Sequence, residues 1–257
     1  MEGRGIQSIE VGGRLLDCLV RSGVPMSLRA LAAEADLTPA QTHAYLTSFK
    51  RTGMIEQKVE SGPYSIGPLA LNLGLARLQS VPLYRDASQL ILRLSETYGF
   101  MSALVVWGPF GPTTVSVAQP SHRQYNLNIR MGTLFSVTGT ASGKLFAAFG
   151  ENAAVHARIK EELAGSPELP GISNETDRRG FEASVAKARK DGYATIENSI
   201  VPDVFTLALP MFESDKTLAG VITCIGSEGA LKEDAFLQTL DAVRTEIMHL
   251  TKAGGTS

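Results

Sequence analysis

The sequence is poor in cysteine and contains no long apolar run. Its two cysteines, Cys18 and Cys224, lie in separate apolar segments, and its four histidines do not cluster with them. A disulfide framework and the common zinc motifs are therefore excluded. No stretch reaches the ~18 apolar residues of a membrane-spanning helix, and the N-terminal segment MEGRGIQSIE lacks the apolar core of a signal peptide. We expect a cytoplasmic protein without a metal, a cofactor or a membrane contact.

The sequence also lacks a basic excess: 24 Lys and Arg stand against 26 Asp and Glu, for a net charge of −2. Over the whole chain, this balance argues against nucleic acid, because DNA-binding domains usually carry surplus positive charge. Residues 1–80 nevertheless hold eight basic and seven acidic residues, so they carry +1 and the remainder carries −3. So small an excess suits DNA binding only if it is clustered and if several copies bind together.

The first part of the chain has the pattern of three short helices and a hairpin. Ser8, Ser27 and Thr38 are candidate N-caps, and Thr38 is followed by Pro39 and by Gln41, which completes a capping box. A Ser-Gly-Pro turn separates two short β-type runs. This order predicts a winged helix-turn-helix whose third helix can enter a major groove. The expected helices are 9–21, 28–35 and 39–51, and the expected strands are 54–60 and 64–67.

The rest of the chain alternates between helical and β-type patterns. A helix is expected over Pro68–Val81, directly after the hairpin. Strands that alternate with helices of this kind predict an α+β sensor domain. The further expected helices are 83–98, 141–150, 153–163, 177–191 and 233–251, and the strands are 102–108, 113–119, 125–131, 193–198, 206–212 and 218–226.

The sequence contains none of the common catalytic motifs. It has no GxSxG, no HExxH and no GxGxxG after a strand, so we expect that it is not an enzyme. The segment Thr138–Lys144 is not a phosphate loop, because position 138 is Thr and position 145 is Leu. It does lead into a helix, and the free N–H groups at a helix start favour an anion such as a carboxylate. Close packing of the small residues is the alternative explanation.

Several segments in order resemble the IclR family of bacterial transcription regulators over essentially the full length. They are SIEVGGRLLDCLV, LRALAAEADL, YLTSFKRTGMIE, YSIGPLALNLG, IRMGTLFSVTGTASGKLFAAF, DGYATIEN and TLALPMFESDKTLAGVITCIG. The resemblance implies a winged-helix DNA-binding domain, a linker helix, a GAF-like effector domain, and homodimers or homotetramers. The corresponding boundaries are 1–67, 68–81 and 82–257.

The expected DNA contacts lie on the third helix and the wing. Gln41 suits adenine, Thr42 suits a thymine methyl group, and His43 can donate to a base or a phosphate. Lys50, Arg51 and Lys58 are the candidates for the DNA backbone. A solvated helix face is the alternative for each of them. The family commonly has an Arg where this sequence has Ala44, which removes one contact.

The resemblance also implies the residues of an effector pocket. The backbone at Ala141 and Ser142 would hold a ligand carboxylate. Ile225 stands where the family often has Ser, so the pocket should be more apolar and suit an aromatic acid. Thr206 and Thr223 are also expected pocket residues. The ordinary preference of threonine for β-strands explains their presence equally well. The remaining expected pocket residues are Leu127, Phe135 and Glu197.

Together these features predict a ligand-responsive DNA-binding regulator. It would bind a palindromic or repeated double-stranded operator as an oligomer and control a catabolic operon in response to a small organic acid, with an aromatic acid favoured. The alternative is a small-molecule sensor or enzyme in which the winged helix serves as a protein–protein module.

Overall fold

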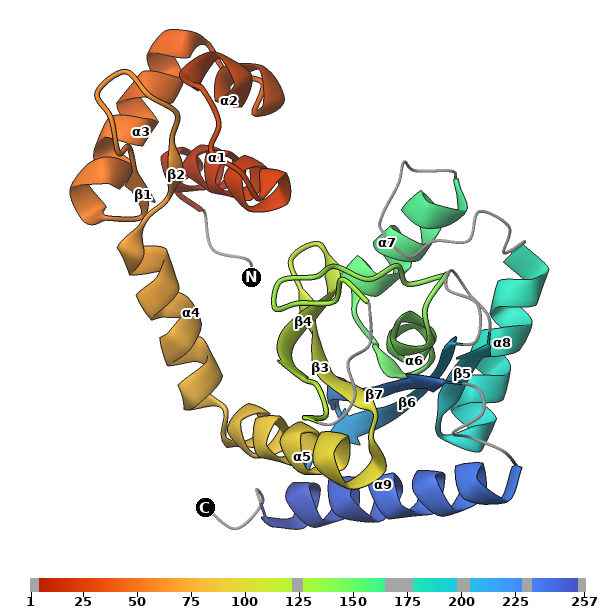
Figure 1. Cartoon of the computed structure of the whole chain (residues 1–257). Helices are drawn as coiled ribbons and strands as arrows, with labels where there is room; N and C mark the ends of the chain where they lie inside the picture. Colours follow the sequence, from red (N-terminus) through yellow and green to blue (C-terminus); the bar gives the residue numbers. More distant parts are fainter. Residues whose placement is uncertain (1–4, 122–126, 165–177, 198–203, 228–232, 254–257) are drawn as a thin grey trace. The chain divides into compact units, whose positions relative to one another are not determined.

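The computed structural model describes residues 5–121, 127–164, 178–197, 204–227 and 233–253, and the chain divides into two compact units, residues 1–80 and 81–257 (Figure 1). We call them the N-terminal unit and the C-terminal unit. The N-terminal unit has the helix-turn-helix and the wing that the sequence predicts. Its elements are α1 (Gln7–Ser22), α2 (Leu28–Glu34), α3 (Pro39–Thr52), β1 (Ile55–Glu56), β2 (Ser65–Ile66) and α4 (Pro68–Ser80).

Local capping sets the helix ends in the N-terminal unit. The Ser27 side chain accepts a hydrogen bond from the backbone N–H of Ala30 at 3.1 Å, which confirms it as the N-cap of α2. Gly53 ends α3 with a left-handed φ of 76°, which glycine adopts at little cost. The prediction for Ser8 was wrong. The N-cap of α1 is Ile6, which makes no side-chain cap bond, so Ser8 lies inside the first turn.

Apolar residues from the first three helices and the wing form the core of the N-terminal unit. The wing is tied to this core by a bridge in which Met26 and Tyr64 exchange backbone hydrogen bonds of 2.9 and 2.7 Å. This bridge holds the hairpin beside the turn between α1 and α2. The buried members of the core are Leu15, Cys18, Leu19, Leu31, Ala35, Leu46, Ile55 and Tyr64.

Helix α4 is apolar but uncovered. All of it lies in the described part of the chain, and none of its residues is buried. The side chains of Leu71, Leu73 and Leu75 are 63%, 53% and 47% exposed. Leu71 and Leu75 lie about one turn apart on the same face, and uncovered leucines stabilise a helix in water only weakly, so this face calls for a partner.

A five-stranded antiparallel sheet forms the centre of the C-terminal unit. Its strand order is β4-β3-β7-β6-β5, and every described neighbour pair is antiparallel. The α+β architecture predicted for this part of the chain is confirmed. The strands are β3 (Met101–Gly108), β4 (Gly111–Ala118), β5 (Ala194–Glu197), β6 (Val204–Phe212) and β7 (Leu218–Ser227). The helices are α5 (Pro82–Tyr98), α6 (Ala141–Phe149), α7 (Ala153–Leu163), α8 (Arg178–Asp191) and α9 (Glu233–Ala253).

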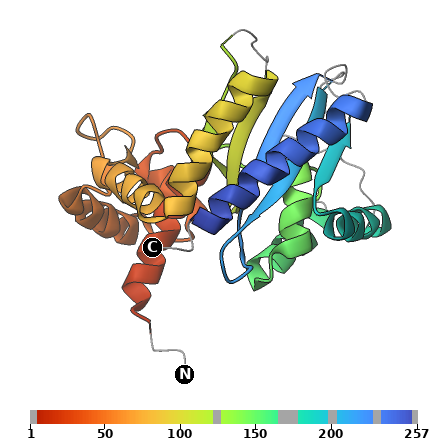
Figure 2. The same cartoon turned by 90° about the horizontal axis from the view of Figure 1, so that it is seen from below.

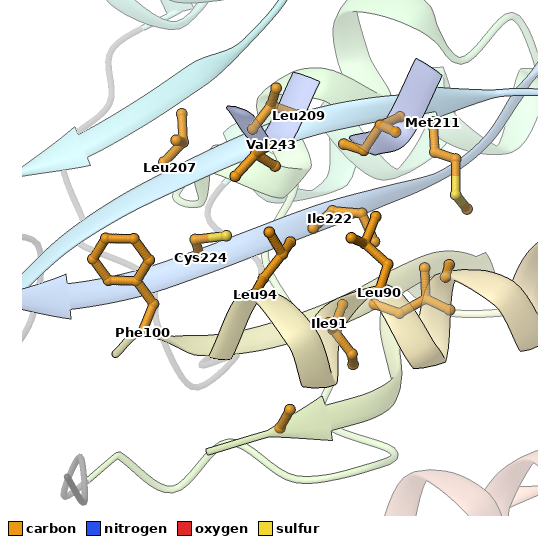
Figure 3. Packing of buried hydrophobic residues seen from close by; sticks show 14 of the residues in the cluster. Leu90, Ile91, Leu94, Phe100, Leu207, Leu209, Met211, Ile222, Cys224 and Val243 are labelled. Carbon is orange, nitrogen blue, oxygen red and sulfur yellow. The ribbon is translucent and has the colours of Figure 1, made fainter. Parts of the chain in front are cut away.

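Helices cover both faces of this sheet. Helices α5 and α9 lie side by side on one face, as Figure 2 shows, and α6 lies on the other with α7 and α8 beside it. In the close-up of Figure 3, Leu90 and Leu94 of α5 point toward Ile222 and Cys224 of β7. A second core, on the other face, packs α6 against Ala103, Ala208 and Val221. Because both faces are buried, apolar residues are continuous along the central strands.

One expected strand is wrong. We predicted a strand over 125–131, and residues 127–131 lie within the described chain but in no strand. The reason lies at the edge of the sheet. The segment just beyond them already bonds to β4: Thr114 donates to the carbonyl of Thr133, and Phe135 donates to that of Pro112.

Candidate DNA-binding and ligand-binding sites

The first turn of α3 is held by a capping box. The side chain of Thr38 accepts from the backbone N–H of Gln41 at 3.3 Å, and Oε1 of Gln41 accepts from the backbone N–H of Thr38 at 3.1 Å. The hydroxyl of Thr38 also donates to the same Oε1 at 2.9 Å. A two-point contact with adenine needs both ends of the glutamine amide. Gln41 can make that contact only if the capping box opens.

The structure corrects the prediction for Thr42. Its side chain is fully buried, so it does not lie on the exposed face of α3. Thr42 falls one helical turn before Leu46, on the face that packs into the core of the N-terminal unit. Its hydroxyl is buried and has no hydrogen-bond partner among the described residues.

His43 is the polar side chain that stands out on the exposed face of α3. It is exposed and makes no hydrogen bond or ion pair within the described chain. Its neighbours on this face are less available, because the hydroxyls of Thr47 and Ser48 donate to the backbone carbonyls of His43 and Ala44, at 2.8 and 3.1 Å. His43 is therefore the side chain best placed to donate to a groove edge or a phosphate.

The three predicted cations differ in how freely they can reach DNA. Lys50 donates to Oε1 of Gln57 at 2.9 Å, so it links α3 to the wing. Arg51 is exposed at the last turn of α3. Lys58, in the wing, has an 82% exposed side chain, and Nζ lies 4.0 Å from a carboxylate oxygen of Glu56. Exposed ion pairs of this length are worth little, so Lys58 can change partners readily.

The second candidate site is the beginning of α6. Thr140 is the N-cap, and its hydroxyl oxygen accepts from the N–H of Gly143 at 3.0 Å. Its carbonyl accepts from the N–H of Lys144, also at 3.0 Å. The N–H groups of Ala141 and Ser142 have no acceptor among the described residues. Two free donors at the positive end of a helix favour an anion.

Side chains from β6 and β7 lie under this helix end. The hydroxyls of Ser142 and Thr223 are hydrogen-bonded at 2.7 Å, and both residues are buried. Ile225 lies two positions further along β7, on the same face, and is paired in register with Thr206 of β6. The structure thus brings Ser142, Thr223, Ile225 and Thr206 to one side of the sheet. The Ser142 hydroxyl is engaged with Thr223, and the backbone N–H of Ser142 is the donor that has no partner among the described residues.

The remaining predicted pocket residues are placed less completely. Phe135 is half-buried and packs with the core that contains Ala141. Leu127 is half-buried, and no described contact joins it to these residues. Glu197 ends β5 and is paired with Phe205, and its side chain lies outside the described part.

Sequence reasoning missed the residue that holds the loop before α6. Glu162 of α7 has a side chain only 2% exposed, and one carboxylate oxygen accepts from the hydroxyls of Ser136 and Thr138 at 2.6 and 2.9 Å. The backbone N–H of Thr138 donates to the same oxygen at 2.9 Å, and the backbone N–H of Val137 and Nε of Arg158 donate to the other oxygen, both at 3.0 Å. Helical spacing could have found it, because Glu162 lies seven residues after the buried Val155.

Burial and hydrogen bonding shift the pKa of three groups in the C-terminal unit. Burial alone would raise the pKa of Glu162, but the hydrogen bonds from Ser136, Thr138 and Val137 outweigh it, so the pKa is lowered. Desolvation lowers the pKa of Lys144, which is half-buried on α6. Burial raises the pKa of Cys224 to about 12.

The described segments show neither a metal-binding cluster nor a membrane-spanning helix. Within them, no three His, Cys, Asp or Glu side chains gather closely enough to bind a metal ion. None of the helices in the same segments combines the length and the apolar character that a bilayer span requires.

Models of two IclR domains match this chain, one for each unit. The model of the IclR helix-turn-helix domain matches residues 8–58, and the model of the bacterial transcriptional regulator IclR C-terminal domain matches residues 77–249. The transcriptional repressor IclR of Escherichia coli is 23% identical over 244 residues, which cover 89% of this chain and 83% of that protein. This repressor and the other curated relatives that match the chain are transcriptional regulators and not enzymes.

Solved structures share the fold over nearly the whole chain. An IclR transcriptional regulator from Alicyclobacillus acidocaldarius is 19% identical with a TM-score of 0.77, covering 97% of this chain and 99% of that one. An IclR homologue from Microbacterium hydrocarbonoxydans, complexed with 4-hydroxybenzoate, is 16% identical with a TM-score of 0.74, covering 97% and 100%. With both family models matched in order along one chain, the protein belongs to the IclR family of bacterial transcriptional regulators and carries a helix-turn-helix DNA-binding domain.

Proposed function

We propose that this protein is a ligand-responsive regulator that binds a double-stranded operator through α3 and senses a small organic acid at the beginning of α6. The observation that carries the proposal is the pair of unpartnered N–H groups at Ala141 and Ser142, in a chain that also has an exposed His43 on its recognition helix. One site suits an anionic ligand and the other suits DNA.

DNA binding should require more than one copy of the chain. The N-terminal unit has a charge excess of only +1, which gives weak attraction to phosphates for a single copy. The uncovered Leu71 and Leu75 of α4 are apolar side chains that a second copy can cover, and so are Ile6 and Ile9 near the start of α1. Two linked helix-turn-helix units then gain affinity through their effective concentration.

The floor of the α6 site favours an aromatic acid. Its hydrocarbon groups include Ile225 and the ring of Phe135, and its donors are backbone N–H groups that suit a carboxylate. The family member crystallised with 4-hydroxybenzoate binds a ligand of this class. We infer that ligand binding changes operator affinity through α4, which connects the two units along the chain, and that the operator changes ligand affinity by the same factor.

The DNA half of the proposal is tested by fluorescence anisotropy with labelled DNA from upstream of the gene. His43→Ala should weaken binding about tenfold, as expected for one lost base or phosphate contact. His156→Ala is the matched control, because His156 is an exposed histidine of the C-terminal unit. If the protein does not bind this DNA, or if the two variants behave alike, the winged helix is better explained as a protein–protein module.

The ligand half is tested by calorimetric titration with 4-hydroxybenzoate. Ala141→Pro removes one of the two free N–H groups, and proline is tolerated at the first position of a helix. The preceding Thr140 is already extended, with φ −124° and ψ 154°, as a residue before proline requires. Binding should weaken about tenfold. Ala153→Pro, at the same position of α7 after the extended Asn152, is the control and should leave binding unchanged.

A further inference from the structure

A cavity lies at the C-terminal end of α6, away from the site at the beginning of this helix. It is a cavity of about 500 Å³ between the last residues of α6 and α8, the end of β6 and the second half of α9. Its floor is apolar and partly aromatic. The rings of Phe149 and Phe212 meet edge to face, with centroids 5.3 Å apart and planes at 89°, and Leu209 and Ile247 complete the floor.

Two arginines line the same cavity, and backbone carbonyls hold both of them in place. Nε and Nη2 of Arg189 donate to the carbonyl of Ala148 at 2.9 and 2.6 Å. Nη2 of Arg244 donates to the carbonyl of Asp191 at 3.2 Å. Carbonyls at helix ends lack partners within their own helix, so these bonds fix the guanidinium groups without an ionised partner.

The charge of these arginines is only weakly compensated. Within the described chain, Arg189 forms no ion pair, and Arg244 lies 3.8 Å from a carboxylate oxygen of Asp241, whose side chain is 77% exposed. Glu213 is the acidic residue in the cavity wall, and it forms no ion pair with either arginine. Asp241 is largely exposed, so solvent screens its charge, and the two guanidinium groups against Glu213 leave a net attraction for a single negative charge, while Glu213 disfavours a second one.

We propose that this cavity is a second ligand site, which binds an aromatic monocarboxylate. The ring would lie against Phe149 and Phe212, and the carboxylate would accept hydrogen bonds from Arg189 and Arg244. An apolar floor with a few convergent polar groups is the usual composition of a small-molecule site, and guanidinium groups match carboxylates in charge and shape. The site is separate from the one at Ser142, because Ser142 and Phe149 are seven positions apart on α6, roughly 10 Å along the helix.

Photolabelling of the full-length protein with 4-azidobenzoate tests the proposal. Mass spectrometry should find label on the cavity residues, in the segments 209–214 or 244–248 or at Phe149. Ser214 is an exposed residue of the cavity wall, so the larger side chain of Ser214→Trp should fill the cavity. The substitution does not alter the two arginines or the carbonyls that hold them, and it should abolish labelling of the cavity. Labelling near Ser142 should persist in this variant.

Binding of 4-fluorobenzoate, followed by fluorine NMR, gives the matching affinity. The double variant Arg189→Gln with Arg244→Gln should weaken cavity binding about ten- to hundredfold, as expected for lost charge-assisted hydrogen bonds. Arg179→Gln, an exposed arginine in the first turn of α8, is the control and should leave it unchanged.

Absence of label from the cavity segments would overturn the proposal. So would labelling that survives Ser214→Trp, or a control variant that weakens binding as much as the double variant. Failure of the proposed function has a different signature: no label near Ser142, or no DNA binding, with cavity labelling intact.

Discussion

Replacing Glu162 by glutamine should destabilise the C-terminal unit by about 3 kcal/mol at neutral pH. The side chain of Glu162 is only 2% exposed. Its carboxylate receives hydrogen bonds from the hydroxyls of Ser136 and Thr138, two backbone N–H groups and Arg158. Glutamine has nearly the same shape but offers one acceptor oxygen and an NH₂ group. The substitution therefore tests hydrogen bonding and charge without leaving a cavity.

The two orientations of the glutamine amide differ in cost. An NH₂ group in the Oε1 position would face the N–H of Val137 and Nε of Arg158, which can only donate. In the Oε2 position it would face the N–H of Thr138, and the two hydroxyls there can turn to accept. The second orientation loses one backbone bond and the charge opposite Arg158. Breaking a buried pair typically costs 3–5 kcal/mol, and the rotating hydroxyls keep this case near the lower end.

Thermal unfolding measures this loss. For a unit of this size, about 3 kcal/mol corresponds to a Tm roughly 6–12 °C lower. Glu161→Gln is the matched control, because the 56% exposed Glu161 pairs with the same Arg158 at 2.9 Å. An exposed pair contributes less than about 1 kcal/mol. Equal effects of the two substitutions, or a loss below about 1 kcal/mol for Glu162→Gln, would refute the reasoning.

The effect of the substitution should also depend on pH. The pKa of Glu162 in the folded protein is below the ordinary value of 4.5. A group of this kind stabilises the fold fully above its unfolded pKa, and the contribution is lost as pH falls through the folded pKa. The Tm difference between wild type and Glu162→Gln should therefore be constant above about pH 5, and shrink in acid. A difference that stays the same down to the acid transition would contradict this assignment.

Three further substitutions have outcomes that the structure specifies. Thr42→Val removes a buried hydroxyl that has no described partner and should raise the free energy of unfolding of the N-terminal unit by up to about 1 kcal/mol in urea titrations. Gly143→Ala places a Cβ 2.3 Å from the carbonyl oxygen of Ser136, so it should cost at least 1–3 kcal/mol and lower the Tm of the C-terminal unit. Leu71→Asn with Leu75→Asn should shift the protein toward the monomer in sedimentation velocity, because these leucines form the apolar surface of α4. An unchanged oligomeric state would place the interface elsewhere.

Both ends of α3 could be predicted because their determinants are local, whereas the start of α1, which has no side-chain cap, was misplaced at Ser8. Thr38 and Gln41 are three residues apart, and Gly53 follows the last residue of α3. The exposure of α3 was less well predicted. The spacing of Thr42 and Leu46 assigns Thr42 to the core, but its polarity favoured the opposite interpretation. Polar residues can be buried where a β-branched shape fits the core, and periodicity was the better guide.

The C-terminal unit shows where local reasoning ends. Its strands were recognisable from their composition, but the sheet edge beside β4 is occupied by Thr133 and Phe135, which no pattern in the segment 125–131 reveals. Glu162 meets its partners across about 25 residues of sequence. The cavity beside Phe149 is assembled from four elements. Pairings of this kind depend on the packed fold and have no signature in any one segment.

The two cysteines provide a practical opportunity. Cys18 and Cys224 are both buried, and burial raises the pKa of each thiol, so little thiolate is available to react at neutral pH. The folded wild-type chain should thus be almost silent toward maleimides. Cysteines introduced together at Leu73 of α4 and at Ser214 beside the cavity would accept a pair of fluorophores or spin labels without prior removal of the native thiols. The distance between the two units, with and without DNA or ligand, then becomes directly measurable.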